Sequence, residues 1–194
     1  MARMAMIPRE EMTPAQAEAC TEAVQGPRGK VPGPMVAWLR NAELARCAQK
    51  LGEVLRFGTS LDPRLRELAI LICARHWTSH YEWTAHKRIA LTEGLAPEVI
   101  NALAAGTPPP FDSAAQELVY RLSRAILQDG RLTDALYEEG LSQIGEAALV
   151  ELVGTLGYYC LVGLTLNVFE LGLPEGHAPE LERSDGPSGP EDPA

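Results

Sequence analysis

Apolar residues recur at helical spacing along most of the chain. Between residues 35 and 57 they follow one another at roughly three or four positions, and the same period returns over residues 112–128. We expect two helices in the first segment, meeting near Asn41, and one in the second. β-branched residues are sparse and no Asn-Gly or Asp-Gly turn lies between alternating segments, so strands are not indicated. The pattern predicts an all-α fold.

Signals for the start of a helix divide the rest of the chain. The segments 13–25 and 62–76 each open with a Thr or Asp followed directly by proline, the order of an N-cap and a first helical residue. Ser79 and Glu82 have the spacing of a capping box, and the helix that they would begin ends before Gly94. The middle of the 62–76 helix, LAILICA, is apolar on every side, so we expect deep burial there. Further helices are predicted over 97–106, from Thr133 onward, and over 146–171.

Residues 152–169 carry no charged side chain and are long enough to span a membrane. No Lys or Arg lies between Arg131 and Arg183, so the basic flank that orients a membrane helix is missing, and three glycines weaken insertion further. A helix that is apolar all round must still be buried, and a chain of this size has limited interior. We therefore expect no membrane contact, and we expect this helix at the subunit interface of a homo-oligomer, a dimer, trimer or hexamer.

The composition is typical of one globular domain, with 46% hydrophobic and 22% charged residues among 194. We expect a helical extension at 1–30, the main domain at 31–173 and a flexible acidic tail at 174–194, where Pro, Gly and acidic residues dominate. The net charge of -9 disfavours binding to nucleic acid, which needs clustered Lys and Arg. The first residues lack the apolar core of a secretory signal, so the expected location is the cytoplasm.

The four cysteines are scattered along the chain. Cys20, Cys47, Cys73 and Cys160 form no CxxC pair, so their spacing indicates neither a zinc site nor a dithiol redox centre. Cys73 and Cys160 lie in apolar runs, where a cysteine usually acts as a small buried hydrophobe. We expect reduced thiols.

The segment 66–95 contains the residues best suited to chemistry. Glu82 and His86 are four positions apart, which makes them neighbours on one helical face. Glu67 lies on the preceding helix, and an antiparallel return of the next helix could bring it to His86. A carboxylate in that place would hold the imidazole in one tautomer and raise its basicity, as in general acid–base sites. His86 is therefore the candidate proton carrier.

Each of these residues also has a purely structural interpretation. Glu82 could be only a helix cap, Glu67 could pair with Arg64, and His86 could be a core histidine bonded to a backbone carbonyl. A metal site built from three histidines is disfavoured because His80 and His86 are six apart, on different helical faces, and no HExxH pattern is present. We expect no metal.

The spacing of these residues resembles a known motif. In alkylhydroperoxidase D, a Glu is followed twelve residues later by the first Cys of a CxxC, and a His stands four residues after the second Cys. Counted from Glu67, those positions hold Ser79, Glu82 and His86. The stretch HYEWTAHKRIALTEGLAPE, with GYY at 157–159, resembles longer carboxymuconolactone decarboxylase-like proteins. The chain is thus similar, over about 32–173, to the carboxymuconolactone decarboxylase and alkylhydroperoxidase D superfamily, in a form that lacks the CxxC.

This resemblance implies an oligomeric alkylhydroperoxidase D-like helical bundle. Both motif cysteines are replaced, so dithiol peroxidase turnover is not expected. The decarboxylase relatives need no cofactor, which implies a cofactor-independent acid–base enzyme acting on a small lactone or ring carboxylate. Two alternatives are a hydroperoxidase-family, peroxiredoxin-like antioxidant protein that has lost the dithiol and a noncatalytic oligomeric module that binds a small molecule.

The predicted roles follow from the decarboxylase interpretation. His86 would donate the proton, and Glu82 or Glu67 would orient the His86 imidazole. The candidate substrate-binding residues are Trp83, His80 and Tyr158, and Arg75 and Arg88 are the candidates for holding a carboxylate.

Overall fold

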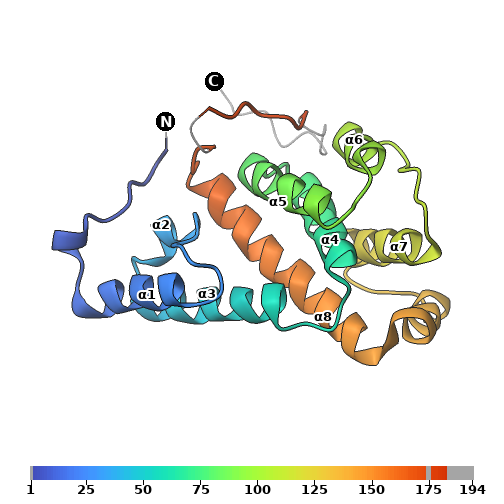
Figure 1. Cartoon of the computed structure of the whole chain (residues 1–194), viewed down its shortest axis with the longest axis horizontal. Coiled ribbons are helices and arrows are strands. Elements are labelled where there is room, and N and C mark those ends of the chain that lie inside the picture. Colours follow the sequence, from blue (N-terminus) through green and yellow to red (C-terminus); the bar gives the residue numbers. More distant parts are fainter. Residues whose placement is uncertain (1, 174–175, 183–194) are drawn as a thin grey trace, which may run out of the picture.

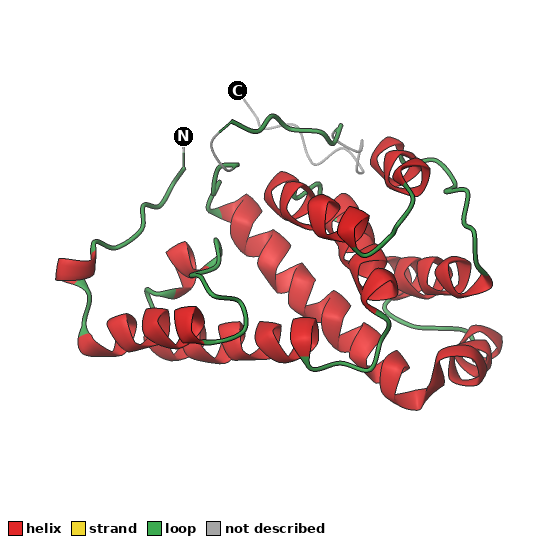
Figure 2. Cartoon of the chain, in the orientation of Figure 1, coloured by secondary structure: helices red, strands yellow, loops and turns green. Residues whose placement is uncertain are grey.

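The structure is a computed structural model that describes residues 2–173 and 176–182. Within these residues it contains α-helices and one 3-10 turn and no strand (Figure 2), so the predicted all-α fold is confirmed. The 3-10 turn is Arg9–Glu11. The helices are α1 Pro14–Gln25, α2 Met35–Trp38, α3 Ala42–Phe57, α4 Pro63–His76, α5 His80–Thr92, α6 Pro97–Ala105, α7 Ala114–Asp129 and α8 Asp134–Val168.

The predicted starts of α1 and α4 are confirmed by their caps. The Thr13 backbone N–H donates to Gln16 Oε1 at 2.8 Å, and the Gln16 N–H donates to Thr13 Oγ1 at 3.3 Å, which completes a capping box. Asp62 accepts from the backbone N–H groups of Arg64 and Leu65. Each cap satisfies helix donors that have no partner within the helix.

The capping box predicted at the start of α5 is wrong. The Ser79 N–H already donates to the carbonyl of Ala74 at 2.8 Å, so it is not available to donate to the Glu82 side chain. The Ser79 hydroxyl is buried and makes no hydrogen bond within the described residues. The α4–α5 turn is tight, with Thr78 at φ 47°, and the Glu82 side chain is left to contact another group.

Helix α4 lies at the centre of the packing. It contacts α5, α6, α7 and α8, and every residue from Leu68 to Ala74 is at most 5% exposed. The expectation of a deeply buried helix is confirmed. A polar side chain carried by this helix must therefore find its partners inside the protein.

Helix α8 is broken at Gly145, where φ of 83° and ψ of 163° interrupt the helical backbone. Glycine adopts this positive φ without the steric cost that a Cβ would add. Beyond the break, α8 runs between α1–α3 and the group formed by α4–α7 (Figure 1). Its inward face packs against α3, α4, α5 and α7, which makes it the second wall of the core.

The outward face of α8 carries an apolar stripe. By length and composition this helix could cross a membrane, yet half of its most apolar window is buried inside the structure, as in a core helix of a soluble protein. Two of its glycines, Gly154 and Gly163, pack within the chain against Leu55 and Trp77. We call the exposed residues of this face the α8 stripe: Val150, Val153, Gly157, Leu161, Leu164 and Val168.

The first and the last residues that the structure describes contact the helices. The Arg3 N–H donates to the Phe169 carbonyl at 3.0 Å, which ties the N-terminal extension to the end of α8. Of the predicted flexible tail, residues 176–182 are described: Leu181 is buried and Glu180 pairs with Lys87 of α5. Residues 174–175 and 183–194 lie outside the described residues.

Candidate active site

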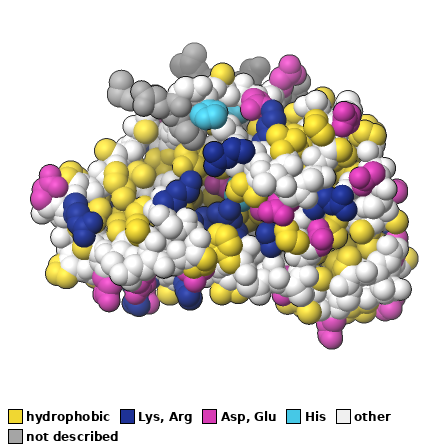
Figure 3. Space-filling model, in the orientation of Figure 1, with side chains coloured by type: hydrophobic (Ala, Val, Ile, Leu, Met, Phe, Trp, Pro, Cys, Tyr) yellow, Lys and Arg dark blue, Asp and Glu magenta, His cyan; other side chains and the backbone are white. Residues whose placement is uncertain are grey.

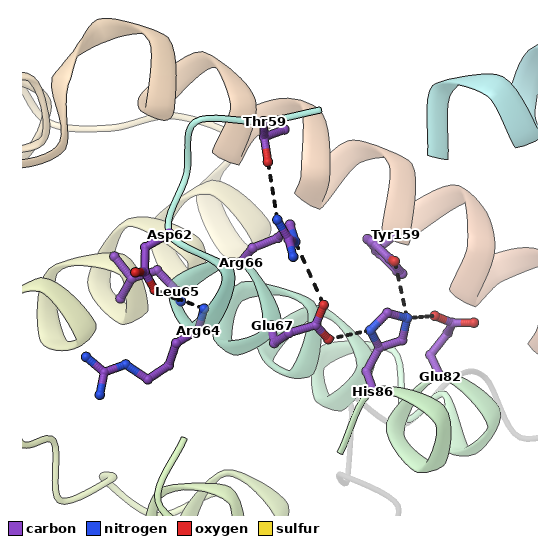
Figure 4. Close-up of polar contacts among 9 residues, drawn as sticks. All are labelled: Thr59, Asp62, Arg64, Leu65, Arg66, Glu67, Glu82, His86 and Tyr159. Carbon is purple, nitrogen blue, oxygen red and sulfur yellow. Dashed lines mark hydrogen bonds and ion pairs between the residues drawn. The ribbon is translucent and has the colours of Figure 1, made fainter. Parts of the chain in front are cut away.

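Glu67 enters the core from the first half of α4. Its side chain is 1% exposed, and its Oε2 lies 2.6 Å from His86 Nδ1 (Figure 4). Its other oxygen lies 3.8 Å from Arg66 Nε. Arg64 instead lies 3.9 Å from Asp112, so the alternative pairing of Glu67 with Arg64 is wrong. The burial of this carboxylate is offset by its imidazole partner.

His86 lies on α5 one turn beyond Glu82 and is 4% exposed. Its Nε2 is 3.3 Å from Glu82 Oε2 and 3.2 Å from the Tyr159 hydroxyl of α8. The Tyr159 ring stands edge-on to the imidazole, with 5.0 Å between the ring centroids. Three helices, α4, α5 and α8, thus hold one imidazole from different directions (Figure 4).

The surroundings of His86 favour its protonated form. Burial is the largest influence and lowers its pKa, but the charge and hydrogen bond of Glu67 and the hydrogen bond of Glu82 together raise the pKa to about 8. In the protonated form, Nδ1–H donates to Glu67 and Nε2–H faces Glu82. In the neutral form, Nδ1–H stays with Glu67 and the Tyr159 O–H donates to Nε2. The site therefore accommodates both states of the ring near neutral pH.

The two tyrosines of the site stay protonated at neutral pH. Burial raises the pKa of Tyr158 to about 12 and raises that of Tyr159 well above its ordinary range, and the nearby Glu82 acts in the same direction. Tyr159 therefore serves as a hydroxyl group that can donate to or accept from His86. It does not serve as a phenolate.

A cavity of about 530 Å³ adjoins the imidazole. Glu82, His86, Tyr158 and Tyr159 line it together with the end of α3 and the segment 27–34. Gly52 of α3 lets Tyr158 reach this wall, because a Cβ at that position would lie 2.1 Å from the Tyr158 hydroxyl. The cavity is large enough to hold a small molecule beside the proton carrier.

The cavity lining is basic although the whole chain is acidic. Among the residues that the structure describes, Arg28, Lys30, Arg56 and Arg88 line it against one carboxylate, Glu82. Nε and Nη2 of Arg28 are buried and have no hydrogen-bond partner among the residues that the structure describes. Lys and Arg side chains also gather near the middle of the face drawn in Figure 3. The cavity can therefore attract and hold an anion.

The fold brings some of the predicted site residues together and leaves others apart. Tyr158 lines the cavity, as does Arg88. Trp83 is wholly buried in the core, and His80 is half-buried at the start of α5; neither lines the cavity. Arg75 lies at a different cavity, of about 320 Å³, between α4, α6 and α7.

Other residues of the site were not identified from the sequence. Tyr159 belongs to the GYY segment, but nothing in its spacing connects it with His86, 73 positions away. The available signal was two adjacent tyrosines in a helix without charges, where each buried hydroxyl needs a partner. Arg28, Lys30 and Arg56 come from loops and helix ends that carry no motif. Among the described residues, no three His, Cys, Asp or Glu side chains are placed to hold a metal ion.

Comparison with known proteins identifies the fold. No family model matches the chain, and no curated protein does. It is similar to a solved structure from Ralstonia eutropha JMP134 described as an alkylhydroperoxidase AhpD core and uncharacterized peroxidase-related protein, with a TM-score of 0.72 and 13% identity, covering 90% of this chain and 93% of that one. An uncharacterized peroxidase-related protein from Silicibacter sp. TM1040 gives a TM-score of 0.70 and 15% identity, covering 89% and 93%. The chain has the alkylhydroperoxidase D-like fold.

Proposed function

We propose that this chain is a cofactor-independent acid–base enzyme of the carboxymuconolactone decarboxylase type that acts on a small lactone or ring carboxylate. One observation carries the proposal: His86 is held between two buried carboxylates at the wall of a cavity lined by basic side chains. A titratable side chain that has a shifted pKa and lies beside a cavity is the usual arrangement of a general acid or base in an active site.

The lining supports an anionic substrate. Over the described part of the chain, four Lys or Arg side chains against one carboxylate attract a negative charge, and the buried Arg28 donors that have no partner there can bind a carboxylate. Arg88 lies two positions after His86 on α5 and lines the same cavity, so it can bind the acid group of a substrate held there. The remaining surfaces of Ile89, Phe57 and Val162 suit an apolar ring.

The proposed reaction needs one proton at one carbon. The bond from the ring to its carboxylate breaks, carbon dioxide leaves, and the electron pair flows into the conjugated lactone carbonyl. Protonated His86 then gives its Nε2 proton to the carbon that carries the electron pair. Glu67 keeps Nδ1–H in place throughout, and Tyr159 donates to Nε2 once the ring is neutral. A proton from solvent, relayed through the Glu82 carboxylate, then returns to Nε2.

The positions of the motif cysteines do not support a thiol peroxidase. The similar solved structures are described as peroxidase-related, but here Ser79 and Glu82 occupy those positions. Ser79 is wholly buried, and Glu82 contacts His86. A hydroxyl and a carboxylate cannot form the sulfenic acid and disulfide that thiol peroxide reduction requires.

We also propose that the chain forms a homo-oligomer through the α8 stripe. The stripe repeats every three or four positions over most of the second half of α8, and Leu161 and Leu164 are 40% and 41% exposed. The fold of the solved neighbours and the burial of the opposite face of α8 favour a soluble protein, and we retain the cytoplasm as its predicted location.

The test uses γ-carboxymuconolactone and a panel of small unsaturated lactone carboxylates. We expect release of carbon dioxide and incorporation of solvent deuterium at one carbon of the product. His86→Gln should lower kcat by about 100-fold or more, the usual contribution of a positioned general acid. His80→Gln, which alters a histidine on the same helix outside the cavity lining, is the matched control and should retain activity. Equal turnover by the His86 variant would exclude this mechanism, and binding without turnover would favour a noncatalytic module.

A further inference from the structure

Two cysteines that are far apart in the sequence come into contact between α4 and α8. Cys73 Sγ and Cys160 Sγ are 3.8 Å apart. The indole N–H of Trp77 donates to Cys160 Sγ at 3.2 Å, and Cys73 Sγ lies 3.8 Å from the carbonyl of Leu156. The spacing of 87 residues gave no sign of this pair, which only the packing of the two helices creates.

The two sulfurs have unequal surroundings. Cys73 is wholly buried, whereas Cys160 is half-buried and so reachable from outside. Hydrogen bonds to Cys160 from Cys73 and, more weakly, from Trp77 outweigh its burial and lower its pKa to about 6. The same contact and deep burial raise the pKa of Cys73 far above its ordinary range. The greater exposure of Cys160 and the Trp77 N–H that donates to it make Cys160 the nucleophile of the pair and Cys73 its buried partner.

We propose that Cys160 is an oxidation site and that Cys73 resolves it, so that a hydroperoxide converts the pair into a reversible disulfide linking α4 to α8. This assignment rests on the contact between the sulfurs, the Trp77 donor and the unequal exposure. It concerns residues other than the motif positions Ser79 and Glu82. It is also independent of the proton chemistry proposed for His86.

The chemistry balances with a hydroperoxide as the oxidant. The Cys160 thiolate attacks one peroxide oxygen, the O–O bond breaks, and the leaving alkoxide or hydroxide takes a proton to become an alcohol or water. Cys160 then carries a sulfenic acid. The Cys73 sulfur attacks this sulfur, the S–S bond forms, and the hydroxyl leaves with the Cys73 proton as water. Two electrons pass from the sulfur pair to the peroxide in a single oxidation of each chain, and dithiothreitol returns them in the assay; the step is a reversible modification and not peroxidase turnover.

Closing the bond requires only a short movement. The sulfurs must approach from 3.8 Å to about 2.05 Å, a distance that rotation of the half-buried Cys160 side chain and a small shift of α8 can supply. The remaining cysteines offer no such partner in the structure: Cys20 is half-buried on α1, and Cys47 is exposed on α3. Cys47 therefore serves as the internal control, because it is more accessible but has no second thiol in contact.

The test treats the full chain with hydrogen peroxide, blocks the remaining thiols and maps the non-reduced peptides by mass spectrometry. We expect a Cys73–Cys160 crosslink that has lost two hydrogens and that dithiothreitol reverses. Cys73→Ser should stop at a Cys160 sulfenic acid that dimedone traps, and Cys47→Ser should behave as the wild type. Alkylation of Cys160 in the untreated chain should be half-maximal near pH 6.

Two outcomes would overturn the proposal. In the first, wild-type chain that remains folded by circular dichroism loses the Cys47 thiol to peroxide while the Cys73 and Cys160 thiols persist. In the second, Cys160 forms only crosslinks between chains. Both outcomes are read from the wild-type protein, so neither depends on whether a variant folds. Neither requires enzyme activity, so a failure here is distinct from a failure of the decarboxylase proposal.

Discussion

The raised pKa of His86 predicts a specific dependence of stability on pH. A histidine whose pKa is higher in the folded state than in the unfolded chain stabilises the fold fully below the unfolded value, and this stabilisation is lost as the pH rises through the folded value. For His86 the two values are 6.5 and about 8. The loss therefore falls between about pH 6.5 and about pH 8, with the protein less stable on the alkaline side.

The magnitude follows from the same two values. A rise from 6.5 to about 8 corresponds to about 2 kcal/mol of unfolding free energy, which is a large part of the stability of a small domain. Glu67 is the main source of the rise, since its carboxylate lies 2.6 Å from Nδ1. In Glu67→Gln the main raising influence is lost while the burial of the ring remains, so the His86 pKa should fall and the loss of stability toward alkaline pH should become smaller.

The assay is urea unfolding at constant ionic strength from about pH 6 to about pH 9, compared between wild type and His86→Gln. Other groups titrate in this range, Cys160 among them, and the difference between the two proteins removes their contribution. His80→Gln is the matched control and should follow the wild type. Imidazole nitrogen shifts from ¹⁵N-labelled wild type give the pKa directly and do not depend on a variant that folds. The reasoning would be refuted by two results together: wild type and His86→Gln lose the same unfolding free energy as the pH rises, and the measured His86 pKa is below 6.5.

Two further predictions concern packing and assembly. Gly52→Ala should destabilise the fold by about 1–3 kcal/mol in thermal unfolding because its Cβ would overlap the Tyr158 hydroxyl. Gly140→Ala, also in a helix, should be neutral or stabilising because its Cβ would lie at an ordinary contact distance of 3.5 Å from Leu122. Leu161→Lys should shift the sedimentation profile toward the monomer while Val24→Lys on α1 leaves it unchanged; a wild type that is already monomeric at micromolar concentration would remove the basis for an α8 interface.

Local signals carried most of the information about the fold. Caps, prolines and helical period identify where the helices begin and end because these features act within one or two turns of the chain. The exception is the turn before α5, where Ser79 and Glu82 fit a capping box by spacing. The Ser79 N–H instead closes the end of α4 on Ala74, a contact that depends on how sharply the chain reverses there. The break of α8 at Gly145 agrees with the two helices expected from Thr133 onward and over 146–171, and a glycine at positive φ is itself a local feature.

The candidate site was predictable only in part. The contact of Glu82 with His86 follows from helical spacing, and the contact of Glu67 with His86 follows from two consecutive antiparallel helices. Tyr159 could not be assigned because the contact between α5 and α8 depends on the tertiary packing of helices that are far apart in the sequence. Trp83, which was expected at the substrate, is in the core because the face of α5 that it occupies points away from the cavity. Side-chain type alone gives no such orientation.

The contact between α4 and α8 carries both chemistries proposed for this protein. Cys73 of α4 contacts Cys160 of α8, and Glu67 of α4 contacts His86, whose other ring nitrogen faces Tyr159, the residue next to Cys160. Successive helical side chains diverge by about 100°. One turn of α8 can therefore present a hydroxyl to His86 and a thiolate to Cys73 at the same time. Because a close-packed core transmits small displacements, we expect a disulfide that draws this turn toward α4 to shift the Tyr159 hydroxyl as well, and thus to change the surroundings of His86.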